Sequence, residues 1–182
     1  VRAMAVEGLG DAPKKRVLAV VKDALADQQW QVRRAVIRSL IQLKDKSWQT
    51  AISNAMLSSN LDPSKEVFPL LEAIGVKKAL PVMKKAFENP KMPQPHRYVE
   101  VLAEKGGDWL LKGFTMGLKL KQKQAREAFI ERLPKLDLRQ AAPLYKAVLS
   151  KQSAEIQKAV LDRLADHDEK LDVGFVKKLL KA

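Results

Sequence analysis

The chain of 182 residues contains no cysteine, only two histidines and 5% aromatic residues. Without cysteine it can form no disulfide, zinc finger, iron–sulfur cluster or thiol nucleophile, and we expect no cofactor. His96 and His167 stand 71 residues apart, and neither has a second ligand at helical spacing, so no metal site is predicted. Gly106-Gly107 reads as a turn, because a phosphate-binding loop needs more glycines in a strand-to-helix context.

Acidic residues are also few, 21 against 34 basic ones, which gives a net charge of +13. The apolar fraction of 46% is too high for a disordered chain. The longest uncharged stretch, residues 47–61, has only 15 residues and is rich in polar side chains, so no membrane span is predicted. We expect a cytoplasmic protein. The apolar pattern is already running at Val1, which we interpret as a fragment of a longer protein.

A repeat with a period of 31 residues runs through the whole chain. Its most regular column is Leu9, Leu40, Leu71, Leu102, Leu133 and Leu164. Further apolar columns lie at the spacing of an amphipathic helix in each half of the unit, so each unit is two helices, here called helix A and helix B. We therefore predict an all-α fold, an α-solenoid (α/α superhelix) of six helix pairs in a single domain over residues 1–182. The approximate units are 1–27, 28–58, 59–89, 90–120, 121–151 and 152–182.

Turn-forming residues separate the helices. Helix A gives way to helix B at residues 10–13, 44–47, Gly75, 106–108, 134–137 and 166–168. Pro81 and Pro143 share one column, early in helix B, where a missing N–H costs little. The proline-rich residues 90–95 replace the start of the fourth helix A and predict either a shortened helix or a bend in the array.

The residues at the helix ends resemble a known family. Val1-Arg2 and Val32-Arg33 open A helices, Asp27 stands before one, and Leu9-Gly10 and Ile74-Gly75 end them. This pattern resembles HEAT repeats, in particular the short bacterial HEAT-like repeats of the phycobilisome-lyase type. The 31-residue register covers all six units, whereas the Val-Arg signature is clear in the first two. The resemblance implies a right-handed superhelix with A helices on the convex face and B helices on a concave, partner-binding face.

The positive charge is concentrated in one half of each unit. The helix B set, defined as residues 15–27 and their 31-residue equivalents, contains 17 basic and five acidic side chains, a net charge of +12. Two of its basic columns are seven residues apart, hence on the same helix face. The columns predict either a solvated, solubilising surface or a ladder of charge that binds an acidic partner. The candidate binding residues are Lys15, Lys22, Lys46, Lys77, Lys84, Lys85, Lys112, Arg139, Lys146, Lys170, Lys177 and Trp109.

The three tryptophans fall in different columns. Trp30 and Trp48 share columns with apolar residues and are predicted to lie in the core. Trp109 stands in a mostly polar column and should be more exposed. Its neighbour Asp108 makes an acid–aromatic pair that resembles those of HEAT-like alkylpurine DNA glycosylases. The alternative is that Trp109 covers the turn after Gly107 while Asp108 caps the helix.

We therefore expect a non-enzymatic interaction scaffold that binds an acidic macromolecule through its B helices. Two partner classes remain open. The family resemblance favours an acidic protein or peptide segment, whereas a lysine stripe also suits a nucleic-acid backbone. A HEAT-like DNA glycosylase activity is a variant of the second alternative.

Overall fold

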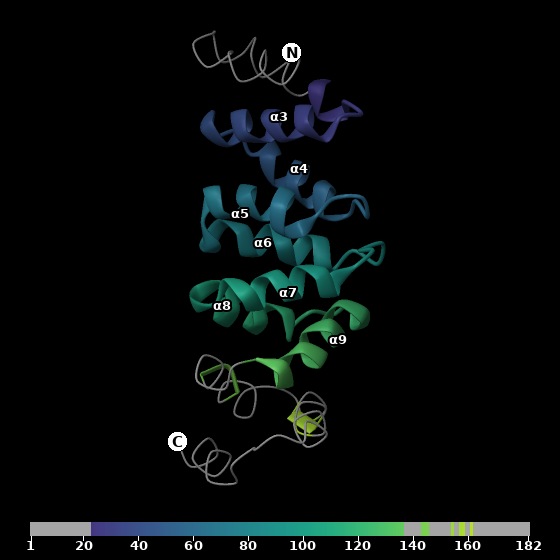
Figure 1. Cartoon of the computed structure of the whole chain (residues 1–182), viewed down its shortest axis with the longest axis vertical. Coiled ribbons are helices and arrows are strands. Elements are labelled where there is room, and N and C mark those ends of the chain that lie inside the picture. Colours follow the sequence, from purple (N-terminus) through teal and green to yellow (C-terminus); the bar gives the residue numbers. More distant parts are fainter. Residues whose placement is uncertain (1–22, 137–142, 146–153, 155–156, 159–160, 162–182) are drawn as a thin grey trace. The chain divides into compact units, whose positions relative to one another are not determined.

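The computed structural model describes residues 23–136, 143–145, 154, 157–158 and 161 (Figure 1). Throughout this described part the secondary structure is helical and contains no strand. The chain divides into two compact units, Val1–Val82 and Met83–Ala182, and the division falls inside one helix, α6. The all-α solenoid class predicted from the repeat is confirmed.

The described part of the first unit contains three complete predicted helices, α3, α4 and α5, and the start of a fourth, α6. Its described elements are η2 (Ala24–Ala26), α3 (Trp30–Gln42), α4 (Ser47–Met56), the π-helix η3 (Pro63–Val67), α5 (Phe68–Ile74) and the start of α6 (Val76–Phe87). In the 31-residue register, α3 and α4 are helices A and B of the second predicted unit, and α5 and α6 are those of the third. Helix α3 packs against α4 and α5.

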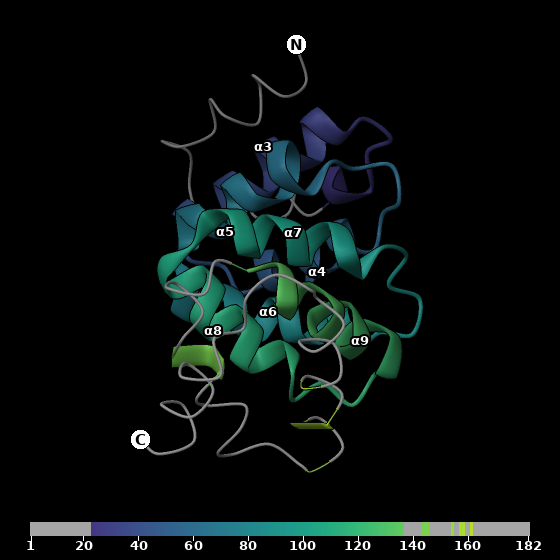
Figure 2. The ribbon, with the colours of Figure 1, turned by 60° about the horizontal axis from the view of Figure 1, so that its bottom comes forward.

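The second unit continues the same alternation. After the end of α6 come α7 (Pro95–Lys105), α8 (Gly107–Gly117), α9 (Lys123–Arg132) and the 3-10 helix η4 (Leu133–Lys135). Helix α7 packs against both α8 and α9, and α8 also contacts α9 (Figure 2). The predicted pairing of helix A with helix B is therefore observed for the fourth 31-residue repeat, and α9 is helix A of the fifth repeat.

The turn from helix A to helix B has a positive φ angle at one register position. Lys44, Gly75 and Gly106 are spaced by 31 residues and have positive φ angles of 55°, 78° and 65°. At the end of α3 the Asp45 N–H donates to the Leu40 carbonyl at 3.0 Å, the reverse-turn bond of a Schellman motif. The turns predicted near residues 44–47, 75 and 106–108 are confirmed, whereas those at 10–13 and 166–168 lie outside the described residues.

The leucine column forms the centre of the core. Leu40, Leu71, Leu102 and Leu133 are each 0% exposed. The column of helix B that begins with Ile52 is equally buried. It continues with Met83, Phe114 and Tyr145, all at 0% exposure. Leu161, which occupies the register position of Ile37, Phe68, Val99 and Ile130, is 41% exposed and is not part of the described core.

Aromatic rings fill the core of the second unit. Phe129 of α9 packs edge-on against Phe87 and Phe114, with ring centroids 5.3 Å and 5.2 Å apart, and Phe87 contacts Tyr98 in the same manner at 6.2 Å. Gly117 of α8 leaves the space that the Phe129 ring occupies. The packing of α8 against α9 therefore requires a glycine at residue 117.

The structure corrects the predicted position of Pro81 in its helix and shows which effect the proline-rich residues 90–95 have on the fourth helix A. Pro81 does not lie in the first turn of helix B. It is the sixth residue of α6, because that helix begins directly after Gly75, so the Lys77 carbonyl lacks its usual i+4 donor. The proline-rich segment shortens the fourth helix A, which begins at Pro95, whereas its register equivalents Trp30 and Lys123 predict a start at residue 92. A bend in the array stays a prediction.

Candidate binding surface

Half of the predicted binding residues lie in the described part of the chain. These are Lys46, Lys77, Lys84, Lys85, Lys112 and Trp109, and all five lysines are exposed. The other six lie outside the described residues. They are Lys15, Lys22, Arg139, Lys146, Lys170 and Lys177.

Helix α6 places its lysines on the side opposite its buried apolar residues. The residues that face the core are Ala79, Val82, Met83, Ala86 and Phe87, each no more than 4% exposed. The exposed residues are Lys77, Lys78, Pro81, Lys84 and Lys85, and the helix contains no acidic residue. We call these five exposed residues the α6 lysine face. Lys78 was part of the basic helix B set but was not singled out from the sequence, although its spacing of seven residues from Lys85 gives the same signal as that of Lys77 from Lys84.

One continuous helix fixes the backbone spacing of the lysines of the α6 lysine face. A spacing of seven residues places the two lysine pairs about 10.5 Å apart along the helix axis. Among the described residues, no carboxylate lies within ion-pair distance of these four lysines. Glu88, directly after the helix, accepts hydrogen bonds from the Lys121 and Gln122 backbone N–H groups and not from these lysines. The face therefore presents four positive charges without an ion-paired carboxylate among the described residues.

Helix α8 presents a different electrostatic surface. Lys112 Nζ lies 2.7 Å from Asp108 Oδ2, one helical turn away, with the two side chains 56% and 62% exposed. The pair neutralises much of the charge of Lys112. In the 31-residue register, Asp108 stands at the position that Lys46 and Lys77 occupy in the preceding repeats. The density of positive charge is consequently greater on α6 than on α8.

Asp108 does not cap its helix. Because Gly106 adopts a positive φ and is itself the N-cap, α8 begins at Gly107 and Asp108 falls in the first turn, where its carboxylate bonds to Lys112. The capping alternative for Asp108 is therefore wrong. Its carboxylate still interacts favourably with the positive end of the helix dipole.

The tryptophans have the predicted order of exposure. Trp30 and Trp48 are each 8% exposed and belong to the core, as expected from their columns. Trp109 is half-buried. A part of its ring remains accessible beside Asp108, and its role in binding stays a prediction.

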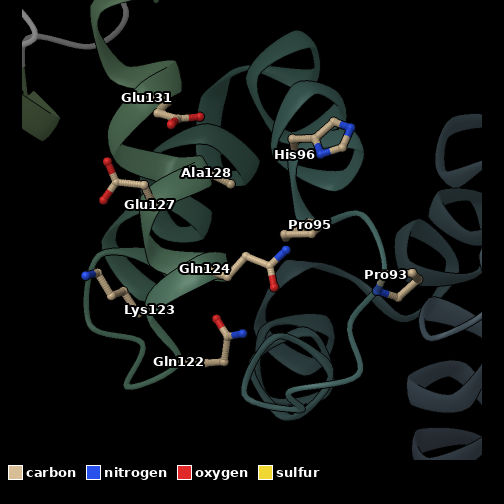
Figure 3. A pocket seen from close by; sticks show the side chains of 9 residues that line it. All are labelled: Pro93, Pro95, His96, Gln122, Lys123, Gln124, Glu127, Ala128 and Glu131. Carbon is tan, nitrogen blue, oxygen red and sulfur yellow. The ribbon is translucent and has the colours of Figure 1, made fainter.

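A cavity lies between helices α7 and α9 of the second unit. It has a volume of about 730 Å³ and opens between the start of α7 and helix α9, where the shortened α7 leaves the first turns of α9 uncovered. Gln124 extends from α9 toward Pro95, whereas Glu127 and Lys123 extend away from it (Figure 3). Within the described residues, no group of three or more His, Cys, Asp or Glu side chains could hold a metal ion. The polar groups here do not converge, so this cavity is a weaker candidate than the α6 lysine face.

The repeated helix pairs, the conserved geometry of the A-to-B turn and the basic helix B surface define an α-helical repeat protein. Residues 1–66 match the family model of HEAT repeats, which supports the HEAT-repeat resemblance for this part of the chain. No curated protein and no solved structure gives a significant match. Membership of the phycobilisome-lyase type stays a prediction, as does the handedness of the superhelix. Among the described helices, none has the length and hydropathy to span a membrane.

Proposed function

We propose that this protein is a non-enzymatic scaffold that binds an acidic macromolecular partner through its B helices, with the α6 lysine face as the centre of the described contact. HEAT arrays generally serve as extended binding surfaces for other macromolecules. The observation that carries the proposal is the segregation of charge on α6. Four exposed lysines share one face, and the same helix contains no acidic residue. A cytoplasmic location and a concave placement of this face are expectations that accompany the proposal.

A surface that only confers solubility mixes charges of both signs. The two lysine pairs lie two turns apart on one helix, and their like charges repel each other weakly through solvent. An anionic ligand would relieve this repulsion. The arrangement on α8, where Lys112 pairs with Asp108, shows the ordinary alternative within the same chain.

An acidic protein segment is the partner class that we favour, and a nucleic-acid backbone is the alternative. The net charge of +12 on the helix B set favours the alternative, because phosphate contacts release counterions. A glycosylase activity would require Asp108 to act on a base drawn into a pocket. Its carboxylate is instead solvent-exposed and paired with Lys112, an environment typical of a surface ion pair.

The test is removal of charge from the α6 lysine face. Lys77, Lys78, Lys84 and Lys85 are changed together to Gln, which avoids placing new negative charge at the helix C-terminus. Affinity for a fluorescein-labelled glutamate-rich peptide, measured by fluorescence anisotropy at low salt, should fall about tenfold or more, since exposed ion pairs are worth about 0.2–1 kcal/mol each. Duplex DNA is titrated in parallel over a range of salt. A loss of about 3 to 4 from the slope of log affinity against log salt would identify phosphate contacts.

A matched control removes four exposed basic residues outside the helix B set. These are Arg38, Lys65, Lys91 and Lys121, all exposed. Changed together to Gln, they should alter peptide affinity much less than the α6 variant does, although the net charge is the same. Equal losses in the two variants would show that only the net charge matters and would overturn the proposal.

A further inference from the structure

The α6 lysine face has an apolar centre. Pro81 is exposed, and it is separated by three or four residues from each of the four lysines. Residues three and four apart on a helix are surface neighbours, about 5–6 Å between Cβ atoms. Pro81 is therefore surrounded by Lys77, Lys78, Lys84 and Lys85, two on each side along the helix axis.

This arrangement discriminates between kinds of anionic ligand. Binding sites for single-stranded nucleic acid combine basic side chains with aromatic side chains on which the bases stack. Phosphates are bound best by arginine, whose guanidinium group forms bidentate hydrogen bonds. The exposed residues of α6 include neither an aromatic ring nor an arginine. They offer four flexible point charges around an apolar ring that has no N–H to donate. The matching ligand has carboxylates at the corners and an apolar side chain in the middle.

A helical peptide has that arrangement at one particular spacing. On a helix that lies along α6, acidic residues at positions 1, 2, 8 and 9 span the same distance of about 10.5 Å, and position 5 lies between them. Packed helices lie about 8–10 Å apart, a separation that lysine and glutamate side chains bridge readily. These five peptide positions have the same spacing as Lys77, Lys78, Pro81, Lys84 and Lys85. An acidic residue corresponds to each lysine, and position 5 corresponds to Pro81.

Building on the proposed function, we propose that the α6 lysine face binds an amphipathic helical protein segment in which two acidic pairs, seven positions apart, flank one large apolar residue. The acidic pairs contact the four lysines, and the apolar side chain packs on Pro81. The carboxylates supply long-range attraction and orientation. The apolar contact and the spacing supply specificity, because surface ion pairs alone are weak.

Three alanine-rich synthetic peptides, matched for helicity by circular dichroism, test the inference. The first has Glu at positions 1, 2, 8 and 9 and Leu at position 5. The second has the same composition, but its second glutamate pair is moved two positions along and so onto the opposite face. The third has Gln in place of the central Leu. Fluorescence anisotropy against the wild-type protein should show about a tenfold loss for the shifted peptide and a similar loss for the Gln peptide.

A Pro81→Gln variant shows whether the apolar contact is made at the predicted place. This change also restores a helix N–H donor, so the variant should fold. The central Leu of the peptide should contribute much less to binding of Pro81→Gln than of the wild type. Equal binding of all three peptides to the wild type, or an equal effect of the central Leu in both proteins, would overturn the inference.

The four-lysine variant separates failure of this inference from failure of the proposed function. If that variant loses affinity for all three peptides while the wild type does not distinguish them, the face binds acidic ligands without the proposed pattern. If the variant binds every peptide as the wild type does, the proposed function itself fails. Tighter binding of duplex DNA than of the first peptide at the same salt would favour the nucleic-acid alternative and contradict the inference.

Discussion

Gly117 of α8 lies directly against the ring of Phe129 of α9, so that a Cβ atom at residue 117 would overlap three ring carbons. The ring is fixed on its other sides by Phe87 and Phe114 and has no room to retreat. The distance between α8 and α9 is therefore set by the absence of a side chain at residue 117. This contact joins helix B of the fourth predicted unit to helix A of the fifth.

Gly117→Ala should lower the free energy of unfolding by about 1–3 kcal/mol, because the added methyl overpacks the core. Gly113→Ala is the matched control on the same helix. Its Cβ would meet the two methyl groups of Leu102, at 2.9 Å and 3.2 Å, and not a ring, and alanine gains up to about 1 kcal/mol in helix propensity, which offsets this closer contact. Urea denaturation should show a clear loss for residue 117 and little change for residue 113. Similar effects at both positions would contradict the packing account.

The left-handed turn column predicts opposite effects at two of its positions. Lys44 is a non-glycine residue with φ 55°, a conformation that costs an L-residue about 1–2 kcal/mol. Lys44→Gly should therefore raise the free energy of unfolding by about 0.5–1 kcal/mol after the entropy of glycine in the unfolded chain is subtracted.

Gly75→Ala should lower the free energy of unfolding by about 1–3 kcal/mol, because φ 78° with ψ 155° is a region that glycine alone adopts readily. No atom lies within 4 Å of the position that the new Cβ would take, so the effect reports backbone strain and not a clash. Thermal or urea unfolding of Lys44→Gly and Gly75→Ala checks the predicted increase and the predicted decrease in the free energy of unfolding. A stabilised Gly75→Ala variant would be incompatible with the turn geometry.

Tyr145 should give the protein an alkaline dependence of stability. Its hydroxyl donates a hydrogen bond to the Leu133 carbonyl, and burial raises the pKa of the phenol well above its usual range. The unfolded chain ionises this group near pH 10, whereas the folded chain keeps it neutral, so the stability contributed by the neutral phenol is lost as the pH rises above about 10.

Tyr145→Phe should cost about 0.5–1.5 kcal/mol at pH 7, since the Leu133 carbonyl loses the phenol donor and keeps the Leu136 N–H. The same variant should lose less stability than the wild type between pH 9 and about pH 11. Deprotonation of the lysines affects both proteins alike, so the difference between the two curves isolates Tyr145. Parallel curves would show that the phenol ionises freely in the folded state.

The sequence was sufficient to predict the repeat, the helix pairs and most of the core, because each depends on the spacing of apolar residues. The 31-residue register places Leu40, Leu71, Leu102 and Leu133 correctly, and all four are fully buried. The sequence could not predict the exact residue at which a helix begins. The bounds of α6 and α8, and with them the roles of Pro81 and Asp108, depend on glycine turns whose φ angles the sequence does not specify.

The candidate surface was predicted in part for a similar reason. The register assigned the lysines to helix B and hence to one side of each unit. The pairing of Lys112 with Asp108, and the exposure of Pro81 among four lysines, follow from side-chain neighbours at three and four residues. These neighbours become visible only when the bounds of α6 and α8 are known.

The central claim is that the α6 lysine face is where an acidic ligand binds, and the absence of native cysteine allows a direct measurement. Single cysteines are placed at Lys78→Cys on that face and at Lys65→Cys on η3, both exposed positions. The rate of maleimide labelling of each thiol is followed with and without a saturating glutamate-rich peptide. The account predicts that the peptide slows labelling at residue 78 and leaves labelling at residue 65 unchanged. Unchanged labelling at residue 78 while the peptide is bound, or protection at residue 65 instead, would contradict it.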